Sequence, residues 1–161
     1  MPMKLIKLIK LFPVFLLACT ISATALAADP APASKEEAMA LVKRATQFAK
    51  QNGKEKAIAE FNKSTGQFVD RELYIVALDL NGILLANAGT NPKLLGKDLK
   101  DIHDIDNIYF TREELALAKG AGHGWINFKW PHPITHNLEP RSVYLERVDD
   151  YIVLAGVYTR K

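Results

Sequence analysis

Gly122-His123-Gly124-Trp125-Ile126-Asn127-Phe128-Lys129-Trp130-Pro131-His132-Pro133 is the stretch that decides the fold of the C-terminal half. Two glycines open it, large apolar side chains alternate with other residues, and a Pro-x-Pro break ends it. This period-2 alternation predicts a strand, and the prolines predict that its regular pairing ends there. The strand therefore brings a large aromatic, Trp130, to a sheet edge, where it is a natural wall for a small-molecule pocket.

Four further strands are expected around this one. Apolar runs predict them at residues 73–79, 83–87, 141–148 and 151–159. Asn81-Gly82 predicts a tight hairpin turn between the first two, because this pair readily adopts positive φ angles. The last two follow each other with only Asp149-Asp150 between them. Short connections of this kind predict an antiparallel sheet of about five strands.

Helices are expected before the sheet and in its middle. Ser34 to Asn52 has an apolar stripe at helical spacing, and Ser34 with Glu37 forms a capping box. A second short helix is predicted at residues 54–61. Thr111-Arg112-Glu113-Glu114 reads as another capping box, opening a helix that ends near Gly120. Residues 88–110 form a long connection, and such loops are often functional. The fold class is therefore α+β.

The N-terminus has the three parts of a secretory signal. Lys4, Lys7 and Lys10 precede an apolar core, and Ala25-Leu26-Ala27 is an A-x-A cleavage site. We expect a signal peptide at residues 1–27 and one domain at residues 28–161, located in the periplasm or secreted. The alternative is a lipoprotein, since Leu16-Leu17-Ala18-Cys19 resembles a lipidation box. No second apolar segment is long enough to span a membrane.

Removal of this leader changes the charge and the cysteine content. It takes away three lysines and no acid, so the net charge falls from +3 to zero. A domain without net positive charge gives no general electrostatic reason to expect nucleic-acid binding. Cys19 is the only cysteine, so the mature domain would contain no disulfide and no thiolate-bound metal.

Several stretches, taken in order, resemble the Cache family of extracytoplasmic sensing domains, and within it the single-Cache, small-ligand type. They span roughly residues 35–160 and are residues 74–82, 95–98, 121–125, 128–133 and 156–158. The resemblance implies a long N-terminal helix packed along the sheet, and a pocket for a small organic ligand such as a short carboxylate. Receptors of this family usually continue into a transmembrane helix and a signalling module, whereas this sequence stops at Lys161. We therefore expect a sensor without its own output module, which would pass its state to a membrane receptor or transporter.

Eight residues are candidates for ligand contact. A guanidinium suits a carboxylate because its planar fork donates two parallel hydrogen bonds, which favours Arg141. In the family, a basic residue and a tyrosine near this position face the ligand, which adds Tyr144. If the strand is regular, however, the odd spacing places these two on opposite faces. The other candidates are Trp130, Phe128, His132, Tyr109, Asn107 and Tyr74, and core or surface roles compete for each of them.

Patterns for other chemistries are weak or missing. His132 and His136 are four residues apart, but the adjacent prolines oppose the helix that would align them, so no metal site is expected. No catalytic motif of the hydrolase, metalloprotease, dinucleotide or phosphate-loop type occurs. We therefore predict a binding protein without a cofactor, not an enzyme. The alternative function is a protein-interaction module with a vestigial pocket.

Overall fold

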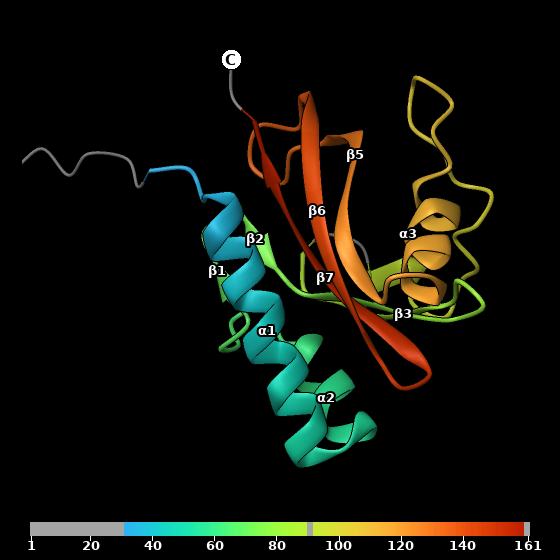
Figure 1. Cartoon of the computed structure of the whole chain (residues 1–161). Coiled ribbons are helices and arrows are strands. Elements are labelled where there is room, and N and C mark those ends of the chain that lie inside the picture. The colour runs from blue at the N-terminus through green and yellow to red at the C-terminus, as the bar shows by residue number, and fades with distance from the viewer. Residues whose placement is uncertain (1–30, 90–91, 160–161) are drawn as a thin grey trace, which may run out of the picture.

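A computed structural model describes residues 31–89 and 92–159. The expected leader, Cys19 and Ala28 lie outside these residues. The centre is a five-stranded antiparallel sheet in the order β4-β3-β7-β6-β5 (Figure 1). A separate hairpin pairs β1 with β2. The strands are β1 (Val69–Asp70), β2 (Leu73–Tyr74), β3 (Val76–Asp79), β4 (Leu84–Asn87), β5 (His123–Pro131), β6 (Leu138–Val148) and β7 (Tyr151–Tyr158). The predicted α+β class and sheet are thereby confirmed.

One face of the sheet is covered by α1 (Lys35–Asn52), which contacts β6 and β7. The helix begins at Ser34 with the expected capping box, since Ser34 and Glu37 each bind the other's backbone N–H. It ends at Gly53, whose positive φ of 82° favours glycine. The short helix α2 (Lys54–Phe61) follows and turns back along α1. Both helices were predicted with nearly these bounds.

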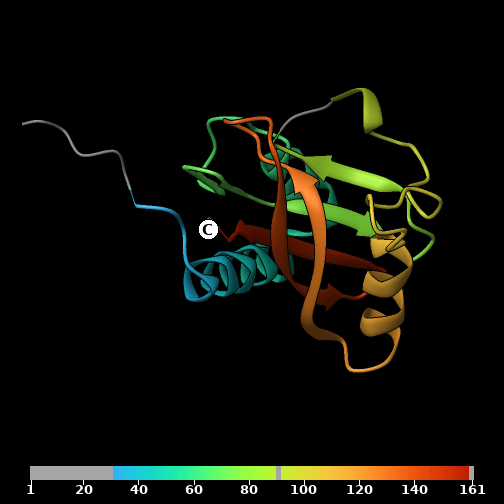
Figure 2. The same cartoon turned by 90° about the horizontal axis from the view of Figure 1, so that it is seen from above.

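The other face of the sheet is covered by α3 (Phe110–Lys119) and by the connection from β4, which includes the short 3-10 helix η1 (Pro92–Leu94). Seen from above, the strands lie between α1 and α3 (Figure 2). The capping box predicted at Thr111 is wrong, because the N-cap is Tyr109, two residues earlier, and no side chain caps the helix. Thr111 and Glu114 are instead buried beneath the helix.

The sheet separates two apolar cores. The α1 side contains a triad of rings in which Phe61 lies 5.0 Å from Phe68 and 6.4 Å from Phe48, measured between ring centroids. The α3 side contains Phe110, Phe128 and aliphatic residues of β3, β6 and β7. Successive residues of β6 therefore point into different cores. The alternation decides which side chains of this strand can reach a pocket on the α3 side.

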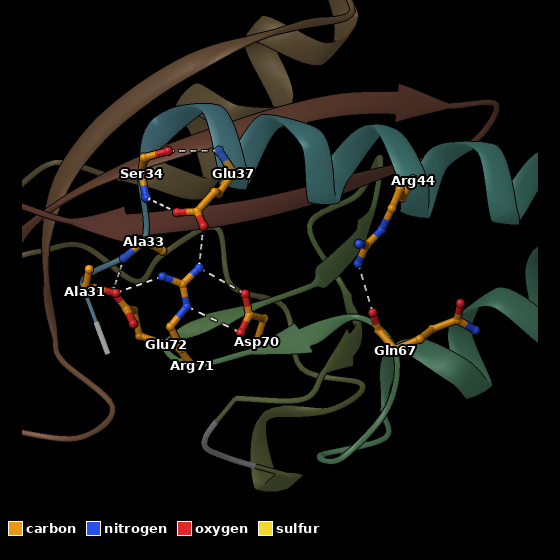
Figure 3. A network of polar contacts seen from close by, with 9 residues as sticks. All are labelled: Ala31, Ala33, Ser34, Glu37, Arg44, Gln67, Asp70, Arg71 and Glu72. Carbon is orange, nitrogen blue, oxygen red and sulfur yellow. Dashed lines mark hydrogen bonds and ion pairs between the residues drawn. The ribbon is translucent and has the colours of Figure 1, made fainter. Parts of the chain in front are cut away.

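A network of polar contacts fastens the start of α1 to the β1–β2 hairpin (Figure 3). Arg71 donates to Glu37 at 2.6 Å, to Asp70 at 3.0 Å, and to the backbone oxygen of Ala31 at 2.8 Å. The buried carboxylate of Glu72 accepts the N–H of Ala33 at 2.7 Å. Several charge-assisted bonds converge here, so the entry to α1 and the hairpin are expected to move together.

The ring triad generates a stability prediction. Phe61→Ala removes a fully buried ring and leaves a cavity, so the free energy of unfolding should fall by about 3–5 kcal/mol. Chemical denaturation of the two proteins measures the difference. Ile105→Ala is the control, because 69% of this side chain is exposed. Equal losses for the two variants would contradict the assignment of the triad to the core.

Candidate functional site

A cavity lies between the sheet, α3 and the connection that follows β4. It offers about 60 Å³ to water-sized groups. Its walls are mostly apolar, but they include a cation, an acid and a hydroxyl. The lining residues are Tyr74, Val76, Leu78, Leu84, Asn87, Leu94, Leu99, Ile102, Phe110, Thr111, Glu114, Phe128, Trp130, Arg141, Val143 and Leu154.

Arg141 is the buried cation of this cavity. It lies on β6, it is only 5% exposed, and its guanidinium carbon is 5.2 Å from the ring centroids of both Tyr74 and Tyr158. Its Nε and Nη2 atoms are buried and have no hydrogen-bond partner. These two donors form one edge of the guanidinium, the edge that can bind both oxygens of a carboxylate. The two rings stabilise the charge, but they supply no hydrogen-bond acceptor to these two donors.

A glycine on the neighbouring strand makes room for this side chain. Gly156 on β7 lies opposite Val143 and two residues before Tyr158. A Cβ atom at this position would lie 2.4 Å from Arg141 Nε and 2.8 Å from Val143 Cγ2. Any larger residue would therefore displace the guanidinium from its place between the two tyrosines. The backbone of β7 thus determines the position of the cation.

The aromatic wall comes from β5 and the first residue of α3. Phe128 stacks on Phe110 at 4.2 Å between centroids, and Trp130 meets Phe110 edge-on at 5.2 Å. Phe128 and Trp130 share a strand face, as the alternation in the sequence predicted. This wall fixes the size of the cavity and excludes water from one side of Arg141.

Two polar residues of α3 complete the cavity, and sequence reasoning missed both as site residues. Thr111 is fully buried and its hydroxyl has no partner, while Glu114 is 3% exposed. Burial raises the pKa of the Glu114 carboxyl to about 8, although Arg141 acts in the opposite direction. The sequence did contain an indication that Glu114 is buried, because this residue falls within the apolar stripe formed by Phe110 and Ala118.

Four of the eight predicted site residues line the cavity: Trp130, Phe128, Arg141 and Tyr74. Tyr144 does not, because β6 is regular between it and Arg141 and turns it to the opposite face. There its ring lies 5.2 Å from Trp125 in the core beneath α1, and its hydroxyl donates to Glu146.

The remaining three predicted residues also lie outside the cavity lining. Tyr109 precedes α3, and its half-exposed ring lies against Arg112. Asn107 is exposed in a turn, with a positive φ of 62°. His132 is buried behind the site, with its ring 4.6 Å from that of Tyr158, and its Nδ1 accepts the N–H of Ile134. These positions follow from loop geometry that the sequence did not define.

Two kinds of feature are absent from the described residues. No group of three or more His, Cys, Asp or Glu side chains in residues 31–89 and 92–159 is placed to hold a metal ion. Within the same ranges, no helix has both the length and the apolar character needed to cross a membrane.

Comparison with known proteins agrees with this architecture. The model of the family called single Cache domain 2 matches residues 21–160, so the chain belongs to that family. This is a family of non-catalytic, signal-sensing domains found outside the cytoplasm. The sensor class expected from the sequence is therefore shown.

Three relatives illustrate the similarity. A Cache chemosensory domain described for its carboxylic acid recognition is 25% identical, with a TM-score of 0.65 over 78% of this chain and 92% of its own. A methyl-accepting chemotaxis protein of Vibrio parahaemolyticus is 26% identical, with a TM-score of 0.63 over 77% and 87%. The methyl-accepting chemotaxis protein McpP of Pseudomonas putida is 33% identical over 70 residues, which are 42% of this chain but only 13% of McpP.

The buried acid generates a prediction about pH. Between roughly pH 4.5 and the raised pKa of about 8, folded Glu114 keeps a proton that the unfolded chain releases, so stability should fall as the pH rises through this window. Glu114→Gln removes this titration. We compare the melting temperatures of the variant and the wild type. Their difference, variant minus wild type, should therefore increase between about pH 5 and about pH 8.

Thermal denaturation without ligand at a series of pH values measures this difference. Glu113→Gln is the matched control, since Glu113 is the exposed neighbour on the same helix. A difference that stays constant with pH, or that appears equally in Glu113→Gln, would contradict a protonated Glu114.

Proposed function

We propose that this chain is a periplasmic sensor domain that binds a short carboxylate and passes its liganded state to a separate signalling or transport protein. The observation that carries the proposal is a buried cation: Arg141 lines a small, largely apolar cavity, and two of its donors have no hydrogen-bond partner. A buried guanidinium with unpaired donors is costly, because it has lost its hydration without replacing those hydrogen bonds. A carboxylate on this edge would supply both bonds and the counter-charge.

The size of the cavity supports a ligand of two to three carbons. The space open to the centres of water-sized groups is about 60 Å³, which is small. Acetate, propionate, lactate and pyruvate are compact molecules that suit a cavity of this size. Phe128 and Trp130 suit the short apolar part of such molecules. The relative described for carboxylic acid recognition adds support from a shared fold.

A route for the signal follows from the chain around Tyr74. This residue lines the cavity, and it lies on the hairpin that contains Arg71 and Glu72. Those two side chains hold residues 31–37 at the start of α1. A ligand that shifts Tyr74 would therefore act on the entry to α1 (Figure 3). We propose this end of the helix as the part that a receptor or transporter partner reads.

A thermal-shift screen tests the ligand class. Acetate, propionate, lactate and pyruvate should raise the melting temperature, whereas amines should not. The free energy gain is roughly 2.7 kcal/mol at a ligand concentration a hundred times the dissociation constant. Arg141→Lys should abolish most of the shift, because lysine keeps the charge but loses the planar fork.

Arg147→Lys is the matched control, since Arg147 lies on the same strand but is exposed. A shift by amines alone, or by none of these compounds, would refute the proposal. An unchanged shift in folded Arg141→Lys would place the anchoring group elsewhere.

Gly156→Ala should remove carboxylate binding although it replaces none of the residues that line the cavity. The added methyl group would collide with Arg141 Nε, so the guanidinium must leave its position. Titration calorimetry with propionate should show at least a tenfold loss of affinity, about 1.4 kcal/mol. Gly120→Ala is the control, because its Cβ would meet only ordinary contacts, the nearest 3.4 Å away. Equal affinities for both variants would show that Gly156 does not position Arg141.

A further inference from the structure

Glu114 faces the same cavity as Arg141, but the two are not paired. No ion pair within 4.0 Å joins them, and in residues 31–89 and 92–159 the Glu114 carboxyl makes no hydrogen bond. The side chain is nevertheless 97% buried, since only 3% is exposed. An acid and a cation thus line one small cavity without forming an ion pair.

The charge state of Glu114 decides what this space can hold. If Glu114 were ionised, it would neutralise the field of Arg141 and repel an entering carboxylate. As a neutral acid it has an O–H donor, which a carboxylate oxygen can accept. Burial favours the neutral form. A carboxylate held by Arg141 would favour it further, because a second negative charge nearby raises the cost of ionisation.

We propose that Glu114 is a specificity-determining residue that meets the bound carboxylate as a neutral acid, so the site takes up a singly charged carboxylate together with a proton. The inference rests on the proposed function and deepens it. Thr111 lies one helical turn earlier on the same face of α3, and its buried hydroxyl is a second donor without a partner. The site thus offers the fork of Arg141 on one side and two neutral donors on the other.

Few other charges act on Glu114. Arg141 approaches from β6 and Glu113 from its own helix, and both influence its titration. Tyr74, from β2, is the third titratable residue of the cavity lining. The other lining residues are neutral at every pH. A pH dependence of binding around the titration of Glu114 can therefore be assigned by substituting these few groups.

The experiment is titration calorimetry of the whole protein with propionate from about pH 6 to about pH 9, where propionate stays ionised. The dissociation constant should be flat at low pH and should rise about tenfold per unit once free Glu114 ionises, since only the protonated fraction binds. In two buffers of different ionisation enthalpy near the upper end, the heats should reveal uptake of close to one proton. This measurement needs no variant.

Glu114→Gln, which is neutral at all pH values and keeps a donor, should bind propionate with a dissociation constant that varies less than about threefold over this range. Glu113→Gln, at the exposed neighbour on the same helix, should retain the pH dependence of the wild type. Binding without proton uptake would overturn this inference but not the proposed function. The same holds if Glu114→Gln shows the pH dependence of the wild type. Loss of binding in folded Glu114→Gln also overturns it. If the wild type binds none of the short carboxylates at any of these pH values, the proposed function fails as well.

Discussion

The burial of Arg141 between Tyr74 and Tyr158 is the interaction on which the site depends. A guanidinium removed from water costs several kcal/mol unless other groups replace its hydration. The two rings offset part of that cost, and the apolar wall of Phe128 and Trp130 keeps water away. Two donors of the guanidinium have no hydrogen-bond partner, and the proposed carboxylate site rests on this observation. Gly156 is as important as the arginine, because the cation fits only where the neighbouring strand has no Cβ.

The two faces of the sheet differ in how they are packed. The α1 face packs small residues such as Ala38 and Ala45 against β6 and β7, which allows a close and rigid contact. The α3 face is less completely filled and contains the polar groups of the cavity. Since β6 contributes alternate residues to both faces, a shift of this strand on ligand binding would be felt on the α1 side. The hydrogen bonds of Arg71 and Glu72 form a second connection to the start of α1.

Arg141 and Glu114 respond in opposite ways to burial in the same cavity. The arginine stays charged in proteins and needs an acceptor, whereas the acid escapes its cost of burial by keeping a proton. The short carboxylate that we propose would satisfy both, because it would supply acceptors to the arginine and accept a hydrogen bond from the protonated acid. The affinity for this ligand and the stability of the empty domain would then both depend on pH.

Local patterns in the sequence were sufficient for most of the fold. The capping box at Ser34, the break at Gly53, the Asn81-Gly82 turn and the alternation in residues 124–130 are properties of neighbours along the chain, and each matched the structure. The face shared by Phe128 and Trp130 followed from strand periodicity alone. Arg141 could be proposed from its chemistry, and the odd spacing to Tyr144 already indicated that both could not face one pocket in a regular strand.

Only the tertiary structure decided which groups meet in the cavity. Three features arise between strands and a helix that are far apart in sequence: the fit of Arg141 over Gly156, the two tyrosines around Arg141, and the burial of Glu114. The pattern Thr111-Glu114 resembles a helix cap when read locally, and it became part of the cavity because α3 begins at Phe110 and turns that face to the sheet. Sequence periodicity shows which residues share a face, but the packing of one element on another determines what that face encloses.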